Sequence, residues 1–94
     1  MATIHSVADF KREVRRWADA IGVRPARVDV RPMKRKWASC SPASGRLTFS
    51  PDLIAAPPRV RKSVIVHELL HLRVPNHGKL FRRLVAAHLK SGLK

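Results

Sequence analysis

Hydrophobic residues recur at helical spacing in the first quarter of the chain, followed by short alternating segments and then two longer helical patterns. The first pattern consists of four apolar residues: Phe10, Val14, Trp17 and Ile21. Ser6 is a favourable N-cap residue, and Gly22 is a residue type that commonly ends helices. This pattern predicts an N-terminal amphipathic helix over residues 6–21, with its apolar stripe facing the core.

Residues 27–50 are predicted to form a β-region. Val28 and Val30 alternate with charged neighbours, which is typical of a short, half-buried strand. Two further alternating segments, 36–41 and 46–50, flank a turn that contains proline, serine and glycine. We expect these two segments to form an antiparallel hairpin.

The second half of the chain is predicted to be helical. A serine followed by proline at residues 50–51 indicates the start of a short helix. The next helix is expected over residues 59–73, and its middle is apolar nearly all round, which indicates a central position. Pro75 is expected to end it, and Asn76 to cap a last helix over residues 77–90.

Length and composition indicate one small α+β domain, residues 1–94, with a thin core. Only 45% of the residues are hydrophobic and five are Phe or Trp, so a bound metal would help to stabilise the fold. The single cysteine, Cys40, excludes an internal disulfide and fits a reducing compartment. No apolar stretch is long enough to span a membrane, and no signal-peptide hydrophobic region is present. We expect a cytoplasmic protein with no membrane partner.

The net charge is strongly positive. Twenty Lys and Arg against six Asp and Glu give a formal charge of +14. Such an excess attracts polyanions, so nucleic acid is a candidate partner through the basic surface. The alternative is a solvated basic surface that reflects arginine-rich codon usage, since charge alone confers no specificity.

The candidate chemistry is concentrated in residues 67–71, which read H-E-x-x-H. Residues four apart lie on one face of a helix, so His67 and His71 can bind one metal ion. Glu68 lies beside them and can accept a proton from a water on that metal. The pattern predicts a zinc-dependent hydrolase with Glu68 as the catalytic general base.

A catalytic zinc takes three protein ligands and leaves a position for water. The chain turns at residues 74–76, so His77 can return toward His71 and is the predicted third ligand. Cys40 and His88 are the alternatives if His77 does not bind.

Two other interpretations of residues 67–71 exist. The first is a core helix that carries two histidines and a glutamate by chance, but a buried Glu68 is costly without a partner, which a metal site supplies. The second is a metzincin, whose ligand spacing matches His67, His71 and His77. Val74 occupies the position of that group's glycine, and no methionine follows residue 33, so we reject the metzincin interpretation.

Four further residues are candidates for substrate binding: Trp37, Ser39, Asn76 and His88. Trp37 and His88 have a competing interpretation as core residues. The chain has no tyrosine, so the residue that stabilises the transition state is left open between His88, Asn76 and a basic side chain.

Four segments together resemble the YgjP-like zinc metallopeptidases, relatives of the SprT and WLM groups within the gluzincin-like zincins. They are KWASCS at 36–41, GRLTFS at 45–50, VIVHELLHL at 64–72 and NHGKLF at 76–81. The family pattern is a W-G-S-C-S hairpin, an H-E-L-x-H-L helix and an N-H-x-x-x-F helix start, and Ala38 departs from it by replacing the glycine. The match spans roughly residues 33 to 88.

The resemblance implies a minimal zincin fold, in which a small antiparallel sheet packs on the active-site helix, with N- and C-terminal helices. It also implies one Zn²⁺ on His67, His71 and His77, with Glu68 as base. A substrate strand is expected to add to the sheet edge, along one strand of the 36–50 hairpin.

The predicted function is that of a zinc metallopeptidase, an endopeptidase acting on protein or peptide substrates. The alternative is a basic nucleic-acid-binding module with a structural or vestigial zinc site, which could process DNA-associated proteins. Glu68 distinguishes the two functions, because a structural site needs the histidines but no base.

Overall fold

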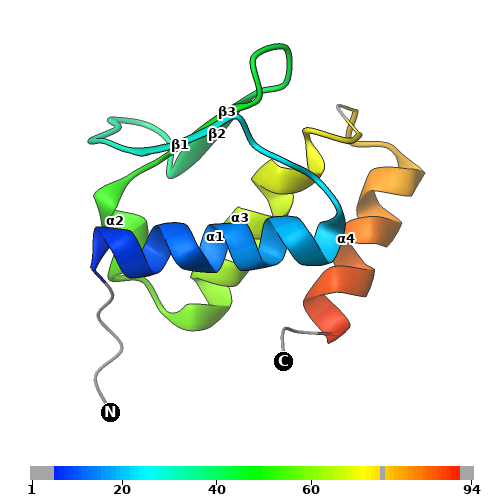
Figure 1. Cartoon of the computed structure of the whole chain (residues 1–94). Helices are drawn as coiled ribbons and strands as arrows, with labels where there is room; N and C mark the ends of the chain where they lie inside the picture. The colour runs from blue at the N-terminus through cyan, green and yellow to red at the C-terminus, as the bar shows by residue number, and fades with distance from the viewer. Residues whose placement is uncertain (1–5, 75, 92–94) are drawn as a thin grey trace.

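A computed structural model describes residues 6–74 and 76–91, and it shows a three-stranded sheet packed on helices. In Figure 1 the sheet lies above the helices, with α1 in front of α3 and α4 to the right. The element order is α1 (Val7–Ile21), β1 (Arg27–Val30), β2 (Ala38–Ser41), β3 (Arg46–Phe49), α2 (Pro51–Ile54), α3 (Pro58–Leu70) and α4 (Lys79–Ser91). Within the described residues, no helix is both long and apolar enough to cross a membrane.

Both ends of α1 are formed as the local sequence predicts. The side chain of Ser6 accepts a hydrogen bond from the backbone N–H of Asp9, 3.0 Å away, which satisfies one of the free donors of the first turn. Gly22 follows the helix in the left-handed region at φ 87°, and its N–H bonds the carbonyl of Ala18. The same serine cap recurs at α2, where Ser50 precedes Pro51 at the first helical position.

The sheet is mixed, with β3 at its centre and β1 and β2 at its edges. β2 pairs antiparallel with β3, which confirms the predicted hairpin, but β1 pairs with β3 in parallel. The expectation of a wholly antiparallel sheet is therefore wrong for β1. Leu47 and Phe49 on β3 are fully buried, so β3 takes the central position, and the segment 31–37 carries the chain past it to the opposite edge.

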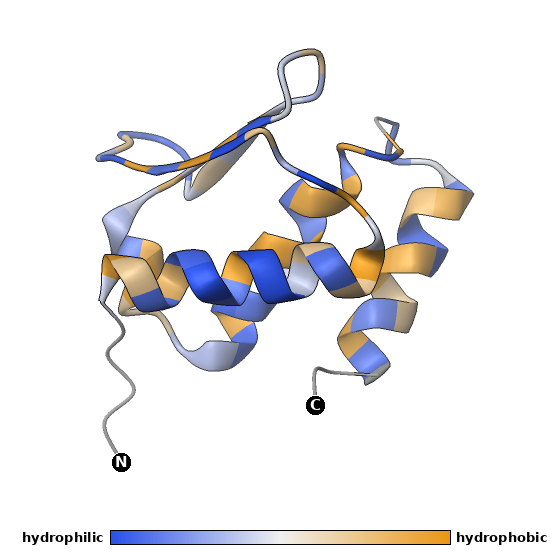
Figure 2. Ribbon diagram, viewed as in Figure 1, coloured by the Kyte–Doolittle hydropathy of each residue, from blue (hydrophilic) through white to orange (hydrophobic). Residues whose placement is uncertain are grey.

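The central helix is α3, as its nearly all-round apolar pattern predicts. It contacts α1, α2, α4 and β2. Its fully buried residues are Ile65, Val66, Leu69 and Leu70. Figure 2 shows hydrophobic and hydrophilic bands side by side on α1 and α4, two of the helices that cover α3. The inner face of the sheet completes the core with Val28, Ala38, Leu47 and Phe49.

The segment between α3 and α4 differs from its prediction. α3 ends at Leu70 rather than residue 73, because the next N–H groups bond carbonyls three residues back, as from Leu72 to Leu69 at 3.1 Å. α4 begins at Lys79 rather than residue 77, so Asn76 lies three positions before the helix and is not its cap. Pro75, the predicted helix terminator, lies outside the described residues.

Three basic side chains connect the helices to one another. The guanidinium of Arg61, on α3, is buried and donates to a carboxylate oxygen of Glu13, on α1, at 2.8 Å. Arg73 donates to the carbonyl of Ile21 at the end of α1, and Lys62 donates to the carbonyl of Leu89 near the end of α4. Each of the latter two cations satisfies carbonyl groups at the negative end of a helix dipole.

The buried ion pair gives a stability prediction. Glu13→Ala removes the carboxylate from a guanidinium that stays buried, so we expect the free energy of unfolding to fall by about 2–4 kcal/mol. Chemical denaturation measures this change. Asp19→Ala, which removes an exposed carboxylate from the same helix, should change stability by less than about 0.5 kcal/mol. Equal stability of the two variants would contradict a structural role for the pair.

Candidate metal centre

Two imidazoles meet where α3 ends. His67 lies in the last turn of α3 and His71 is its C-cap, so they are one helical turn apart. Their Nε2 atoms are 3.2 Å apart, and the two rings meet edge to face at an interplanar angle of 82°. The i, i+4 spacing in the sequence is therefore realised as a pair of nitrogen atoms directed at a common point.

His77 completes a cluster of three histidines. The chain reverses after α3, and the Nε2 of His77 lies 2.8 Å from the Nε2 of His71. The ligand nitrogens of His67, His71 and His77 all lie within 4.8 Å of one another. His77 is exposed, whereas His67 and His71 are half-buried, so the cluster opens to solvent on the His77 side.

The donor set and its spacing fit a metal ion. Three nitrogens at tetrahedral positions about 2.0–2.1 Å from one zinc ion lie roughly 3.3 Å from each other. The Nε2 of His71 lies 3.2 Å from that of His67 and 2.8 Å from that of His77, which is close to that value. Among the described residues, these three histidines form a group of side chains that could hold a metal ion.

Phe81 supports all three imidazoles from one side. It is buried in α4, and its ring centroid lies 5.2 Å from that of His67, 4.8 Å from that of His71 and 4.9 Å from that of His77. The His71 ring stacks on it at an interplanar angle of 23°. This apolar contact restricts the ring orientations and excludes water from one side of the cluster.

The surroundings favour the protonation states that metal binding requires. Partial burial lowers the pKa of His67, and the neighbouring His71 and His77 lower it further, because an added positive charge would be repelled there. Burial raises the pKa of Glu68, while the positive charges of Lys36 and His77 act in the opposite direction. Glu68 is therefore a half-buried carboxyl that is more basic than one in water.

Cys40 lies close enough to Glu68 for their charges to interact. Burial, and then the negative charge of Glu68, raise the pKa of the Cys40 thiol to about 11, so the thiol stays protonated at neutral pH. Cys40 and His88 do not belong to the described cluster of candidate ligands. His88 lies nine residues beyond the start of α4, about 13 Å along the helix axis from Lys79.

The remaining candidates lie at different places around the site. Trp37 is 47% exposed, so its interpretation as a core residue is wrong. It precedes β2, and burial begins only at the next residue, Ala38, which faces the core. Ser39 pairs with Thr48 and lies on the sheet face opposite the buried Ala38, directed away from the core. Asn76 is exposed and lies between α3 and α4.

Two residues near the site had no assigned role in the sequence. Phe81 contacts the three imidazoles, and its i+4 spacing from His77 is a local signal of that contact. Lys36 affects the pKa of Glu68 from another element, and no local spacing links positions 36 and 68.

The comparisons with known proteins agree with this geometry. The family model "YgjP-like, metallopeptidase domain" matches residues 4–91. The chain is also similar to the structure described as the metallopeptidase zymogen of Pyrococcus abyssi abylysin, with a TM-score of 0.72 and 25% sequence identity. That match covers 81% of this chain and 75% of the other. None of the curated proteins matches the chain.

Metal content tests the third ligand. We expect His77→Ala to weaken zinc binding by more than about 100-fold, because losing a ligand should cost at least as much as losing a residue that supports one. Metal analysis of the purified protein after dialysis measures the change. His88→Ala is the matched control and should retain the wild-type zinc content. Equal zinc content in His77→Ala and wild type would contradict ligation by His77.

Metal affinity should also depend on pH. A histidine binds metal only when neutral, so protons compete with the metal increasingly as the pH falls through about 6.5. Because the pKa of His67 is lowered, His67 should stay neutral to a lower pH than an imidazole in water. We expect the dissociation constant for zinc, measured against a chromophoric chelator, to rise at least tenfold between about pH 7.5 and about pH 5.5. A constant value across this range would contradict histidine ligation.

Proposed function

Because the chain belongs to the YgjP-like metallopeptidase domain family, we propose that it is a zinc-dependent endopeptidase with Glu68 as its general base. Membership of a metallopeptidase family makes it a hydrolase that acts on proteins or peptides. The observation that carries the specific proposal is the convergence of three Nε2 atoms at the end of α3, with a half-buried carboxyl on the adjacent residue. The matched region is proposed to act as one metallopeptidase domain.

The proposed ligands are the Nε2 atoms of His67, His71 and His77. The lowered pKa of His67 keeps that imidazole neutral and able to donate its lone pair at physiological pH. A zinc ion bound there would supply Lewis-acid chemistry, activating a water molecule and polarising the scissile carbonyl. Phe81 limits the movement of the three rings, so their positions are set before substrate arrives.

Glu68 has the properties of a general base. It follows His67 on α3, and the charge of His77 acts on its carboxyl, which supports a position beside the three imidazoles. Its raised pKa makes it a stronger proton acceptor than an exposed glutamate, and the charges of Lys36 and His77 help keep it ionised. We propose that Glu68 accepts a proton from the attacking water and delivers it to the leaving amine.

The free edge of β2 is the proposed binding surface for the substrate backbone. β3 is bonded to a neighbour on both sides, so within the hairpin only β2 has an unpaired edge. β2 contacts α3, and Cys40 on this strand lies near Glu68, so the edge runs beside the site. An extended polypeptide can add to it through backbone hydrogen bonds, which recognise a peptide whatever its sequence.

Replacing the base distinguishes the peptidase from a nucleic-acid-binding module with a structural zinc. We expect Glu68→Gln to keep the fold and the zinc content while lowering kcat by about 100-fold or more, because the amide cannot accept the proton. Cleavage of an unfolded protein substrate, followed together with metal content, measures this. Asp19→Asn, the same change at an exposed position of α1, should retain activity. Undiminished cleavage by Glu68→Gln would refute the proposed mechanism.

A further inference from the structure

The loop between β1 and β2 carries a concentration of positive charge, of which the proposed mechanism uses only Lys36. We call residues 31–36 the basic loop. Its four cationic residues are Arg31, Lys34, Arg35 and Lys36, all exposed, and it contains no acidic residue. Together with Ser39 and Thr48 of the sheet, the loop lines a hollow of about 640 Å³. Figure 2 shows the loop as mostly hydrophilic.

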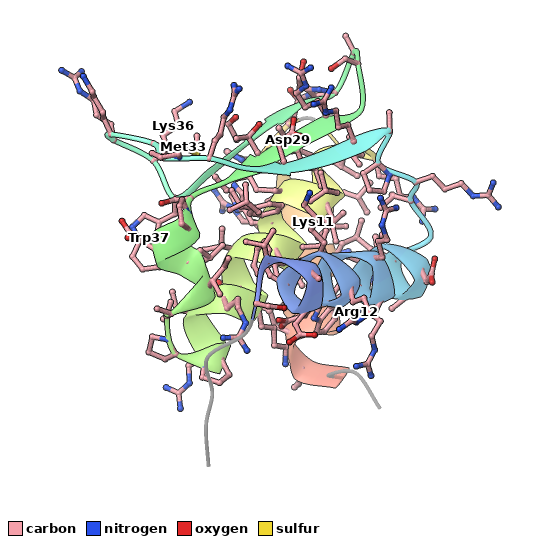
Figure 3. The ribbon with its side chains drawn as sticks, turned by 60° about the vertical axis from the view of Figure 1, so that its left-hand side comes forward. Lys11, Arg12, Asp29, Met33, Lys36 and Trp37 are labelled. Carbon is pink, nitrogen blue, oxygen red and sulfur yellow. The ribbon has the colours of Figure 1, made fainter. Side chains whose placement is uncertain are left out.

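The basic loop adjoins the proposed substrate edge. It is followed directly by Trp37 and then by β2, so a polypeptide extended along the free edge of β2 meets the loop at one of its ends. Figure 3 shows Met33 and Lys36 on this loop at the end of the sheet, with Trp37 below them. Lys36 is also near enough to Glu68 for its positive charge to act on that carboxyl, so the basic loop and the candidate metal centre interact electrostatically.

The acidic residues of the chain do little to offset this charge. Asp29 of β1 bonds Arg27 at 2.9 Å and lies 3.6 Å from Arg46, so its carboxylate is already engaged on the sheet. Of the other five acids, three lie on α1 and one on α2, and Glu68 is the one at the site. No acidic residue follows Glu68, whereas α4 begins with cations at Lys79, Arg82 and Arg83. The surface around the site is therefore positive on both the loop side and the α4 side.

We infer that the basic loop selects substrates with acidic side chains on one side of the scissile bond. This inference rests on the proposed peptidase function and names its substrate class: acidic, extended segments of protein. Side chains of a strand bound to β2 would alternate between the two faces of the sheet, and those on the outer face would lie toward the hollow lined by Ser39 and Thr48. The hydroxyl groups there can donate hydrogen bonds to carboxylates while the loop supplies the charge.

The placement of the loop favours a peptide over a nucleic acid as the ligand. The charge is gathered beside an unpaired strand edge, which recognises a peptide backbone. The one aromatic residue exposed near the loop is Trp37, whereas single-stranded nucleic acid is usually held by several stacked aromatic side chains. Charge complementarity of this kind acts mainly by speeding encounter, so it should appear in kcat/KM and depend on salt.

Four peptides that share one cleavable core test the inference. One carries three Asp residues on the N-terminal side of the scissile bond, a second carries them on the C-terminal side, and the other two carry Asn at the same positions. We expect one of the acidic peptides to be cleaved with about tenfold higher kcat/KM than its Asn partner at low salt. The ratio should fall toward one as ionic strength rises from about 0.02 M to about 0.3 M.

Matched charge-removing variants assign the preference to the basic loop. In the double variant Lys34→Gln/Arg35→Gln, the ratio should fall to about two- or threefold, since each exposed charge contributes modestly. Arg15→Gln/Arg16→Gln removes the same charge from the exposed side of α1 and should keep the tenfold ratio. Lys36 is left unchanged because its substitution would also alter Glu68.

Three results would overturn the inference: equal cleavage of acidic and neutral peptides, a preference that survives in the loop variant, or a preference lost equally in both variants. Failure of the proposed function looks different, because then no peptide is cleaved. Fluorescence anisotropy with Glu68→Gln measures peptide binding independently of cleavage, and equal binding of the Asp and Asn peptides would also overturn the inference. A single-stranded oligonucleotide that binds the loop more tightly than the acidic peptide would assign the surface to nucleic acid instead.

Discussion

The burial of α3 on nearly every side is the constraint on which the rest of the structure depends. Ile65, Val66, Leu69 and Leu70 are fully buried, so apolar surface must cover the helix in several directions at once. In 94 residues this cover is provided by α1, α2, α4 and β2. At the end of α3 the polar side chains of His67, Glu68 and His71 are only half-buried, so they are accessible to solvent. A site at that point combines a rigid support with access to solvent.

Gathering three imidazoles at the candidate metal centre has an energetic cost, because it makes a positive charge on His67 unfavourable. The ligand atoms of the three imidazoles lie within 4.8 Å of one another, and partial burial, followed by the nearby His71 and His77, lowers the pKa of His67. A bound metal ion would accept one lone pair from each neutral imidazole. Metal binding and folding are therefore expected to be coupled. The small core makes such coupling more important than it would be in a large domain.

Electrostatics connects the site with the surface around it. Glu68 is the sole acidic residue among the last forty-two of the chain, and the positive charges of Lys36 and His77 act on it. In the proposed function, the same positive charges that favour the ionised form of this carboxyl would attract negatively charged substrates. One distribution of charge can thus serve both the chemistry and the choice of substrate, provided that the substrate is held along the edge of β2.

Local interactions let the sequence predict much of this protein, whereas long-range packing decided the remainder. The serine caps of α1 and α2, the β2–β3 hairpin and the common face of His67 and His71 all follow from contacts within a few residues. The parallel pairing of β1, the exposure of Trp37 and the approach of Lys36 to Glu68 join residues far apart in sequence. No periodicity encodes such contacts, because they depend on which surfaces the whole chain can bury together. His77 lies between these cases: its return toward α3 was predictable from the turn, but its distance from His71 was set only by the packing of α4 through Phe81.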